Sequence, residues 1–268
     1  MISQLVTLVG RSFRRSRGLL MSLAAVLAIF QVLVVVAASY LREQQGFSQV
    51  VALLPVIAQQ FFGALLSSFT GMVAFGYWHP VVVIAFVGVA IVVASEPAAD
   101  LESRVVDLVL ARPVRRSLAI TRSVVATALT TLMLVVLMVA TSAISLGAVE
   151  GSAAVAPAVR MVTKLAANLV AVSWCLGALA LAASTVLSRR GTAAGGTGVI
   201  AFASYLLNAL ADVSPKFKAF GPYSPFHYFQ PMAIVAGGSR WQSDIGLLLV
   251  VAAMLCAVAY VAWSRRDL

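Results

Sequence analysis

Long apolar runs, separated by short polar or charged stretches, dominate the chain. A bilayer core about 30 Å thick is crossed by a helix of roughly 20 apolar residues, because each residue advances an α-helix by about 1.5 Å. Runs of that order lie at residues 19–40, 79–95, 118–147, 165–187, 192–211 and 245–263. The pattern therefore predicts an all-α, polytopic membrane protein with six transmembrane helices, in a single domain over residues 1–268.

The first 17 residues show a different pattern. Apolar side chains recur there at helical spacing, and four arginines gather toward the far end. This predicts an N-terminal interfacial helix, with its apolar face toward the hydrocarbon and its arginines toward anionic headgroups. A signal peptide cleaved near Ala37-Ala38-Ser39 is the alternative. The run 19–40 exceeds the roughly 7–15 residues of a signal-peptide core, so we expect an uncleaved first span.

Residues 50–77 are apolar enough to enter the membrane, but Pro55, Gln59 and Gln60 interrupt them. We expect a re-entrant or interfacial segment that leads into the second span. Six spans place both termini on one side of the membrane, whereas a seventh span at 50–77 would separate them.

Composition and charge agree with this prediction. Hydrophobic residues make up 62% of the 268, and only 10% are charged, against about 25% in a typical soluble domain. With both termini cytoplasmic, thirteen of the 19 Lys and Arg residues lie inside, and six lie outside: Arg42, Arg160, Lys164, Lys216, Lys218 and Arg240. This bias follows the positive-inside rule, so the net charge of +10 indicates orientation. We expect a multi-pass protein of the cytoplasmic (inner) membrane that binds no nucleic acid.

The sequence carries no pattern typical of catalysis or metal binding. No Gly-Lys dipeptide occurs, which excludes a phosphate-binding Walker A loop. Cys175 and Cys256 both lie in apolar runs, which argues against a disulfide framework or a zinc site. The middles of the predicted spans carry no Asp, Glu, Lys or Arg, which argues against a proton-coupled carrier. We expect no catalytic residue, metal ion or cofactor in this chain.

Residues 95–117 are the most informative hydrophilic stretch. Four of the nine acidic residues lie there: Glu96, Asp100, Glu102 and Asp107. Ser95 suits the cap of a helix and Pro113 its end. One apolar stripe at helical spacing is formed by Leu101, Val105, Leu108 and Val109. The pattern predicts an amphipathic helix between the second and third spans.

Such a helix can rest on lipid or on the ends of its own spans, or it can insert into a groove of a soluble partner. Lipid-bound helices usually carry Lys and Arg on their polar face. This helix carries both signs, and Arg104 can pair with Asp100 and with Asp107. The mixed charge favours a protein partner.

The run from Glu102 to Arg116 resembles the cytoplasmic motif of ABC-2 type transporter permeases. That motif is roughly a glutamate, Gly-Thr, an acidic residue, a Leu-rich triplet and a Pro-Val-x-Arg ending. The matching residues are Asp107, Leu108, Leu110, Pro113, Val114 and Arg116. Arg104-Val105 replace the usual Gly-Thr. Residues 223–231 are similar to the family's extracytoplasmic Ser-Pro-Phe-x-Tyr stretch.

This resemblance implies a permease subunit that exports a substrate with energy from a separate chain. It implies a homodimer or a pair with a similar chain, two cytoplasmic ABC ATPase subunits that hold ATP and Mg²⁺, and cytoplasmic termini. A coupling helix at 96–112 would then dock the ATPase. The expected docking residues are Glu96, Asp100, Leu101, Glu102, Arg104, Val105, Asp107, Leu108, Val109, Arg112 and Pro113. An ion-coupled secondary transporter and a non-transporting scaffold are the alternatives.

Two further groups of residues are candidates for the transport path. The predicted extracytoplasmic loop at 212–244 is rich in proline and aromatic residues, typical of an interfacial belt and also compatible with an outer gate. The candidate gate residues are Tyr223, Phe226, His227, Tyr228 and Phe229. The polar residues in or near spans are Gln31, Asn168, Ser173 and Asn208. These four either form interhelical hydrogen bonds or line the path.

Overall fold

The computed structural model describes residues 2–44, 46–53, 55–56, 59, 63, 66–103, 116–238 and 240–266. Within these ranges the regular elements are α-helices and short 3-10 helices, and six helical stretches are long and apolar enough to cross a membrane. The predicted all-α class is therefore confirmed, and the described residues contain six candidate spans, the number predicted. The spanning helices are α1 (Ile2–Glu43), α4 with α5 (Phe69–Trp78 and Pro80–Ala94), α8 (Ser117–Glu150), α9 (Ser152–Val186), α10 (Arg190–Val213) and α12 (Trp241–Ser264).

The remaining elements are short and lie between the spans. They are α2 (Phe47–Ala52), α6 (Glu96–Glu102), η1 (Lys218–Tyr223), η2 (Pro225–Tyr228) and α11 (Pro231–Val235). Of the predicted re-entrant or interfacial segment at 50–77, residues 69–77 belong to α4 and so to the second candidate span, and residues 54, 57, 58, 60–62, 64 and 65 lie outside the described residues. The helical stretch of the second candidate span thus begins at Phe69 rather than at 79, and the helix of the fourth, α9, begins at Ser152 rather than at 165.

The first helix runs without a break from Ile2 to Glu43, so the predicted N-terminal helix is continuous with the first span. Its 42 residues reach about 63 Å, roughly twice the thickness of a bilayer core. No proline occurs in this stretch, and Gly18 has no neighbour that an added Cβ would meet. A single glycine costs a helix only about 1 kcal/mol, so nothing local ends the helix between residues 17 and 19.

The second span is divided at His79, whose backbone is extended (φ −53°, ψ 129°). The residue before a proline avoids the helical region, and Pro80 follows directly. Because Pro80 has no N–H, the carbonyl oxygen of Gly76 lacks its usual donor four residues on. The side-chain Nε2 of Gln31, on α1, donates a hydrogen bond to that oxygen at 3.0 Å. A neighbouring helix thus satisfies the carbonyl group that the proline leaves free.

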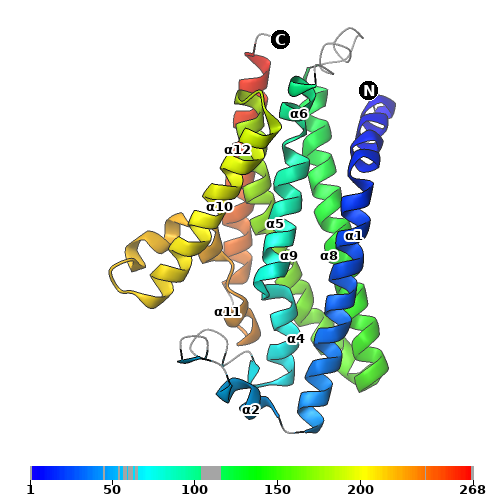
Figure 1. Cartoon of the computed structure of the whole chain (residues 1–268), viewed down its shortest axis with the longest axis vertical. Coiled ribbons are helices and arrows are strands. Elements are labelled where there is room, and N and C mark those ends of the chain that lie inside the picture. Colours follow the sequence, from blue (N-terminus) through cyan, green and yellow to red (C-terminus); the bar gives the residue numbers. More distant parts are fainter. Residues whose placement is uncertain are drawn as a thin grey trace.

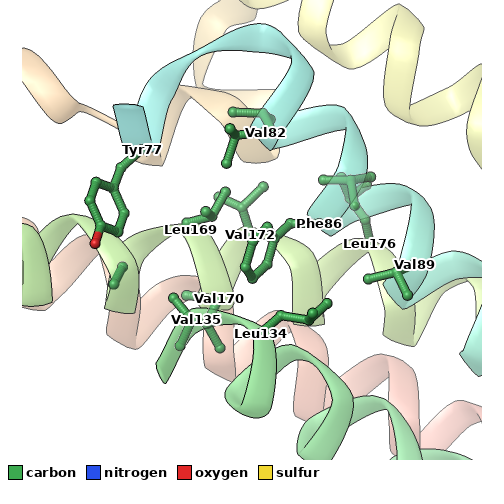
Figure 2. Close-up of a cluster of buried hydrophobic side chains, with 14 of the residues drawn as sticks. Tyr77, Val82, Phe86, Val89, Leu134, Val135, Leu169, Val170, Val172 and Leu176 are labelled. Carbon is green, nitrogen blue, oxygen red and sulfur yellow. The ribbon is translucent and has the colours of Figure 1, made fainter. Parts of the chain in front are cut away.

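The core surrounds α9, the most deeply buried spanning helix, which packs against α5, α8 and α12. Figure 2 shows Phe86 of α5, Leu134 of α8 and Leu169 of α9 meeting there. Close approach depends on small residues, as is common between membrane helices. A Cβ on Gly177 would lie 3.3 Å from both Ala90 Cβ and Thr127 Cγ2.

The two ends of the bundle differ. Figure 1 shows both chain termini and α6 at one end, which we call the terminal end, and α2 and α11 toward the other, which we call the loop end. The arrangement agrees with an even number of crossings. That the terminal end faces the cytoplasm stays a prediction from the charge bias.

Candidate functional site

The predicted docking helix is described in its first part, α6. Ser95 precedes it and Pro97 lies in its first turn, where a missing N–H costs nothing. Glu96, Asp100, Leu101 and Glu102 belong to α6. The other predicted docking residues lie outside the described residues: Arg104, Val105, Asp107, Leu108, Val109, Arg112 and Pro113.

Two acidic side chains of α6 turn inward, where Glu96 and Asp100 are only 3% and 7% exposed. From α8, Arg122 Nη1 donates to Asp100 Oδ2 at 2.8 Å, and its Nε lies 3.4 Å from Glu96 Oε2. From α1, Ser12 Oγ donates to Glu96 Oε2, and Arg15 Nη1 lies 3.6 Å from Asp100 Oδ1. We call these five residues the α6 charge cluster.

The α6 charge cluster joins the ends of three helices. Glu96 and Asp100 are one turn apart and therefore share a face of α6. Two carboxylates face two guanidinium groups, so the formal charges balance. Buried ion pairs add little net stability over apolar packing, but the loss of one partner strands a buried charge at a cost of about 3–5 kcal/mol. The cluster therefore makes it costly for α6 to separate from α1 or α8.

The end of α6 also contacts α10. Glu102 Oε2 accepts a hydrogen bond at 3.0 Å from the backbone N–H of Arg190, the first residue of α10. A carboxylate is favourable at a helix N-terminus, where backbone N–H groups lack partners. Leu101 is half-buried and packs against the core. The described docking residues thus contact helices of their own chain, and their role toward a partner stays a prediction.

Sequence reasoning did not find the α6 charge cluster. Its partners Ser12, Arg15 and Arg122 are distant from α6 along the chain. The available signal was Arg122 itself, a charge inside the apolar run at 118–147 that needs a buried partner.

A cavity of about 510 Å³ lies toward the loop end. Three parts of the chain form it: the joint between α4 and α5, the last turns of α10, and the stretch 226–233. We call it the loop-end cavity. Its lining residues are Trp78, Val83, Tyr205, Asn208, Ala209, Asp212, Phe226, His227, Phe229, Gln230, Pro231, Met232 and Ala233.

The candidate gate residues take different positions around the loop-end cavity. Phe226, His227 and Phe229 line it, and both phenylalanines are buried. Tyr223 is 81% exposed and is not among the lining residues. The hydroxyl group of Tyr228 donates to the carbonyl oxygen of Pro222 at 3.0 Å, so it closes the loop on itself.

The four polar residues predicted in or near the spans lie in different surroundings. Gln31 is fully buried and bridges helices, since it also accepts a hydrogen bond from Ser142 at 3.3 Å. Asn168 Nδ2 donates to the carbonyl oxygen of Tyr228 at 3.0 Å, and Ser173 donates within its own helix. Of the four, Asn208 alone lines the loop-end cavity.

The polar groups of the loop-end cavity include one carboxylate, that of Asp212, and the side-chain amides of Asn208 and Gln230. Asn208 Nδ2 donates to Asp212 Oδ2 at 3.2 Å, one turn along α10. Asn208 Oδ1 is buried and accepts no hydrogen bond from the described residues. Gln230 Nε2 donates to the backbone oxygen of His227 at 3.0 Å, and the imidazole of His227 interacts electrostatically with Asp212. The cavity offers a carboxylate and a free amide oxygen between aromatic walls.

The fold defines the class of this protein as a multi-pass, α-helical membrane protein. No known protein family matches the sequence, and a comparison with curated proteins finds no match either. In the described part of the chain, no three His, Cys, Asp or Glu residues are placed to hold a metal ion.

Proposed function

We propose that this chain is the permease subunit of an ABC-2 type exporter, driven by ATP that separate ATPase subunits hydrolyse. The observation that carries the proposal is the buried anchoring of α6, which ties the segment between the second and third spans to α1 and α8. A partner that moves α6 moves these spans with it, because separating them would strand buried charges. The resemblance of 102–116 and 223–231 to the permease family supports the same function.

The helix α10 is one connection between the two ends. Its first residue, Arg190, is bonded to Glu102 of α6, and its last turns carry Asn208 and Asp212 of the loop-end cavity. Its 24 residues span about 36 Å. Together with α12 it is the least buried spanning helix, so few contacts oppose its displacement. A push on α6 would reach the cavity along this helix.

In this proposal the terminal end faces the cytoplasm and receives the ATPase subunits, with their ATP and Mg²⁺. A second permease chain, identical or similar, completes the transporter. The loop-end cavity is then the outward part of the export path.

The proposal predicts that an adjacent reading frame encodes an ATPase with a Gly-x₄-Gly-Lys-Ser/Thr loop, and the test is co-purification with that ATPase. The double substitution Leu101→Asp and Leu108→Asp should abolish co-purification and leave membrane insertion intact. Because Leu101 also packs against the core, Leu108→Asp alone is the cleaner variant. Lys216→Asp, an exposed change in the loop after α10, is the matched control. Undiminished co-purification of the Leu108→Asp variant would contradict docking.

Transport assays in proteoliposomes separate this function from the alternatives. Transport that survives ATP depletion and collapses with the ion gradient would indicate a secondary transporter. A scaffold would give no transport and no cargo-dependent stimulation of the ATPase.

A further inference from the structure

We infer that the loop-end cavity binds an amphipathic organic cation, with its ammonium group against Asp212 and Asn208 and its apolar body between the aromatic walls. As an assignment of cargo this deepens the proposed function and rests on it. As a binding site of this chain it requires no ATPase.

The first observation is a carboxylate beside an amide oxygen that accepts no hydrogen bond from the described residues. Asp212 is the one acidic residue in the described cavity lining, which contains no Lys or Arg, and the imidazole of His227 is the basic group near it there. Asn208 donates its amide N–H to this carboxylate, and its amide oxygen is buried and receives no hydrogen bond from the part of the chain that the structure describes. A buried acceptor without a partner is unfavourable, and a ligand N–H would satisfy it. The carboxylate and the amide oxygen together select a donor that carries positive charge.

The second observation is the aromatic wall. Tyr205 and Phe226 meet edge to face, with ring centroids 5.4 Å apart, and Trp78 and Phe229 also line the cavity. Aromatic faces attract ammonium groups, and they also shelter an apolar ligand body from water. A volume of about 510 Å³ lies within the range of roughly 300–1,000 Å³ that small-molecule sites occupy.

The third observation is the location of the charge. Asp212 lies in the last turn of α10, one residue before the helix ends at Val213. A carboxylate is tolerated near the end of a span, where water reaches it. The loop-end cavity thus places its charge toward solvent and Trp78 and Val83 deeper along the second span, which suits a ligand with one charged and one apolar end.

The experiment measures binding of monodansylcadaverine, a fluorophore on a short alkyl chain that ends in an ammonium group. The full-length chain is purified in dodecyl maltoside without any ATPase, and the probe's fluorescence is titrated. Its N-acetyl derivative has the same body without the charge. We expect the acetylated probe to bind at least about tenfold more weakly, since it cannot form the charge-assisted hydrogen bond to the Asp212 carboxylate.

Three variants make the test specific. Asp212→Asn should weaken binding of the charged probe by about ten- to a hundredfold and leave the acetylated probe unaffected. Asp212→Glu keeps the charge and should restore most of the affinity. Asp244→Asn removes a carboxylate near the start of α12, outside the cavity lining, and should change nothing. Equal affinity of both probes, or full binding by a monodisperse Asp212→Asn variant, would overturn the inference.

The ammonium group can belong to a soluble amine or to a lipid headgroup. Displacement of the probe by short-chain phosphatidylethanolamine, but not by phosphatidylglycerol, would assign the site to a lipid. Displacement by neither would assign it to soluble amines, and both results retain the cation site.

If the ATPase fails to co-purify while the probe still binds, the proposed function fails and the site stands. If the ATPase co-purifies and charge makes no difference to binding, the inference fails alone.

Discussion

The side chain of Gln31 donates a hydrogen bond to the carbonyl oxygen of Gly76, the acceptor that Pro80 leaves without an intrahelical donor. The same amide group accepts from Ser142, whose hydroxyl group lies 2.9 Å from the hydroxyl group of Tyr77. The discontinuity in the second span is therefore secured by the first and third spans. Polar contacts of this kind give an apolar bundle a defined register, because their partners cannot slide without losing them.

Substitution of Gln31 by Leu should lower the free energy of unfolding by about 1–3 kcal/mol, because the Gly76 carbonyl oxygen then stays buried without a donor. Unfolding by SDS in mixed micelles, followed by tryptophan fluorescence, measures this change. Gln4→Leu, an exposed position of the same helix, is the control. Adding Pro80→Ala should recover part of the loss, because it returns an N–H to position 80. Equal effects at positions 31 and 4 would refute the role of the contact.

Gly76→Ala should destabilise the protein by about 1–3 kcal/mol in the same assay, because overpacking displaces well-fitted neighbours. A Cβ at this position would lie 2.8 Å from Gln31 Oε1 and 3.3 Å from Val34 Cγ1. Gly88→Ala is the matched control, since a Cβ there meets nothing within 4 Å. Alanine favours a helix over glycine, so the control should be neutral or slightly stabilising. A stable Gly76→Ala protein would show that α1 and α4 are not held this closely.

Arg122→Gln should cost about 3–5 kcal/mol, because Glu96 and Asp100 then remain buried and, of the arginines in the cluster, Arg15 alone is left, beside Asp100. Neutralising both carboxylates in the same variant, with Glu96→Gln and Asp100→Asn, should recover much of the stability. Arg160→Gln, an exposed arginine on α9, should change stability by no more than about 0.5 kcal/mol. If the variant with all three substitutions is no more stable than Arg122→Gln alone, charge balance is not what stabilises the cluster.

Orientation can be tested by labelling single cysteines after Cys175→Ala and Cys256→Ala. Arg17→Cys lies on the exposed side of α1 toward the terminal end, and Lys218→Cys is exposed in η1. If the charge bias sets the topology, an impermeant maleimide labels position 218 in intact cells and position 17 only after permeabilisation. The opposite labelling pattern would mean that the terminal end faces outward and the loop end faces the cytoplasm.

The spans were predictable because each depends on local composition alone. Runs of about 20 apolar residues need no knowledge of their neighbours to be recognised. The ends of the spans were harder to predict where a contact with another helix, and not the local sequence, decides whether the helix continues. The pair His79-Pro80 has the form of a helix start, and the residues before it become part of the same span partly because Gln31 satisfies the Gly76 carbonyl.

The candidate sites were predictable only in part, since they depend on contacts between distant segments. The sequence placed Phe226, His227 and Phe229 in one loop and Asn208 in a span, but not around a shared cavity. Asp212 was missed because a single carboxylate at the end of a span is ordinary in isolation. Asp212 becomes a candidate binding residue because it lines the same cavity as Tyr205 and Phe226.

The joint at His79 has a consequence for how the two ends of the molecule communicate. Trp78 ends α4, Val83 lies in the first turn of α5, and both line the loop-end cavity, so a change in the bend between the two helices changes the width of the cavity. From the joint, α5 runs directly to Ser95 and α6. A ligand that holds the bend open would therefore displace α6. By reciprocity, a partner that binds to α6 and displaces it changes the affinity for the ligand by the same factor as the ligand changes the affinity for that partner.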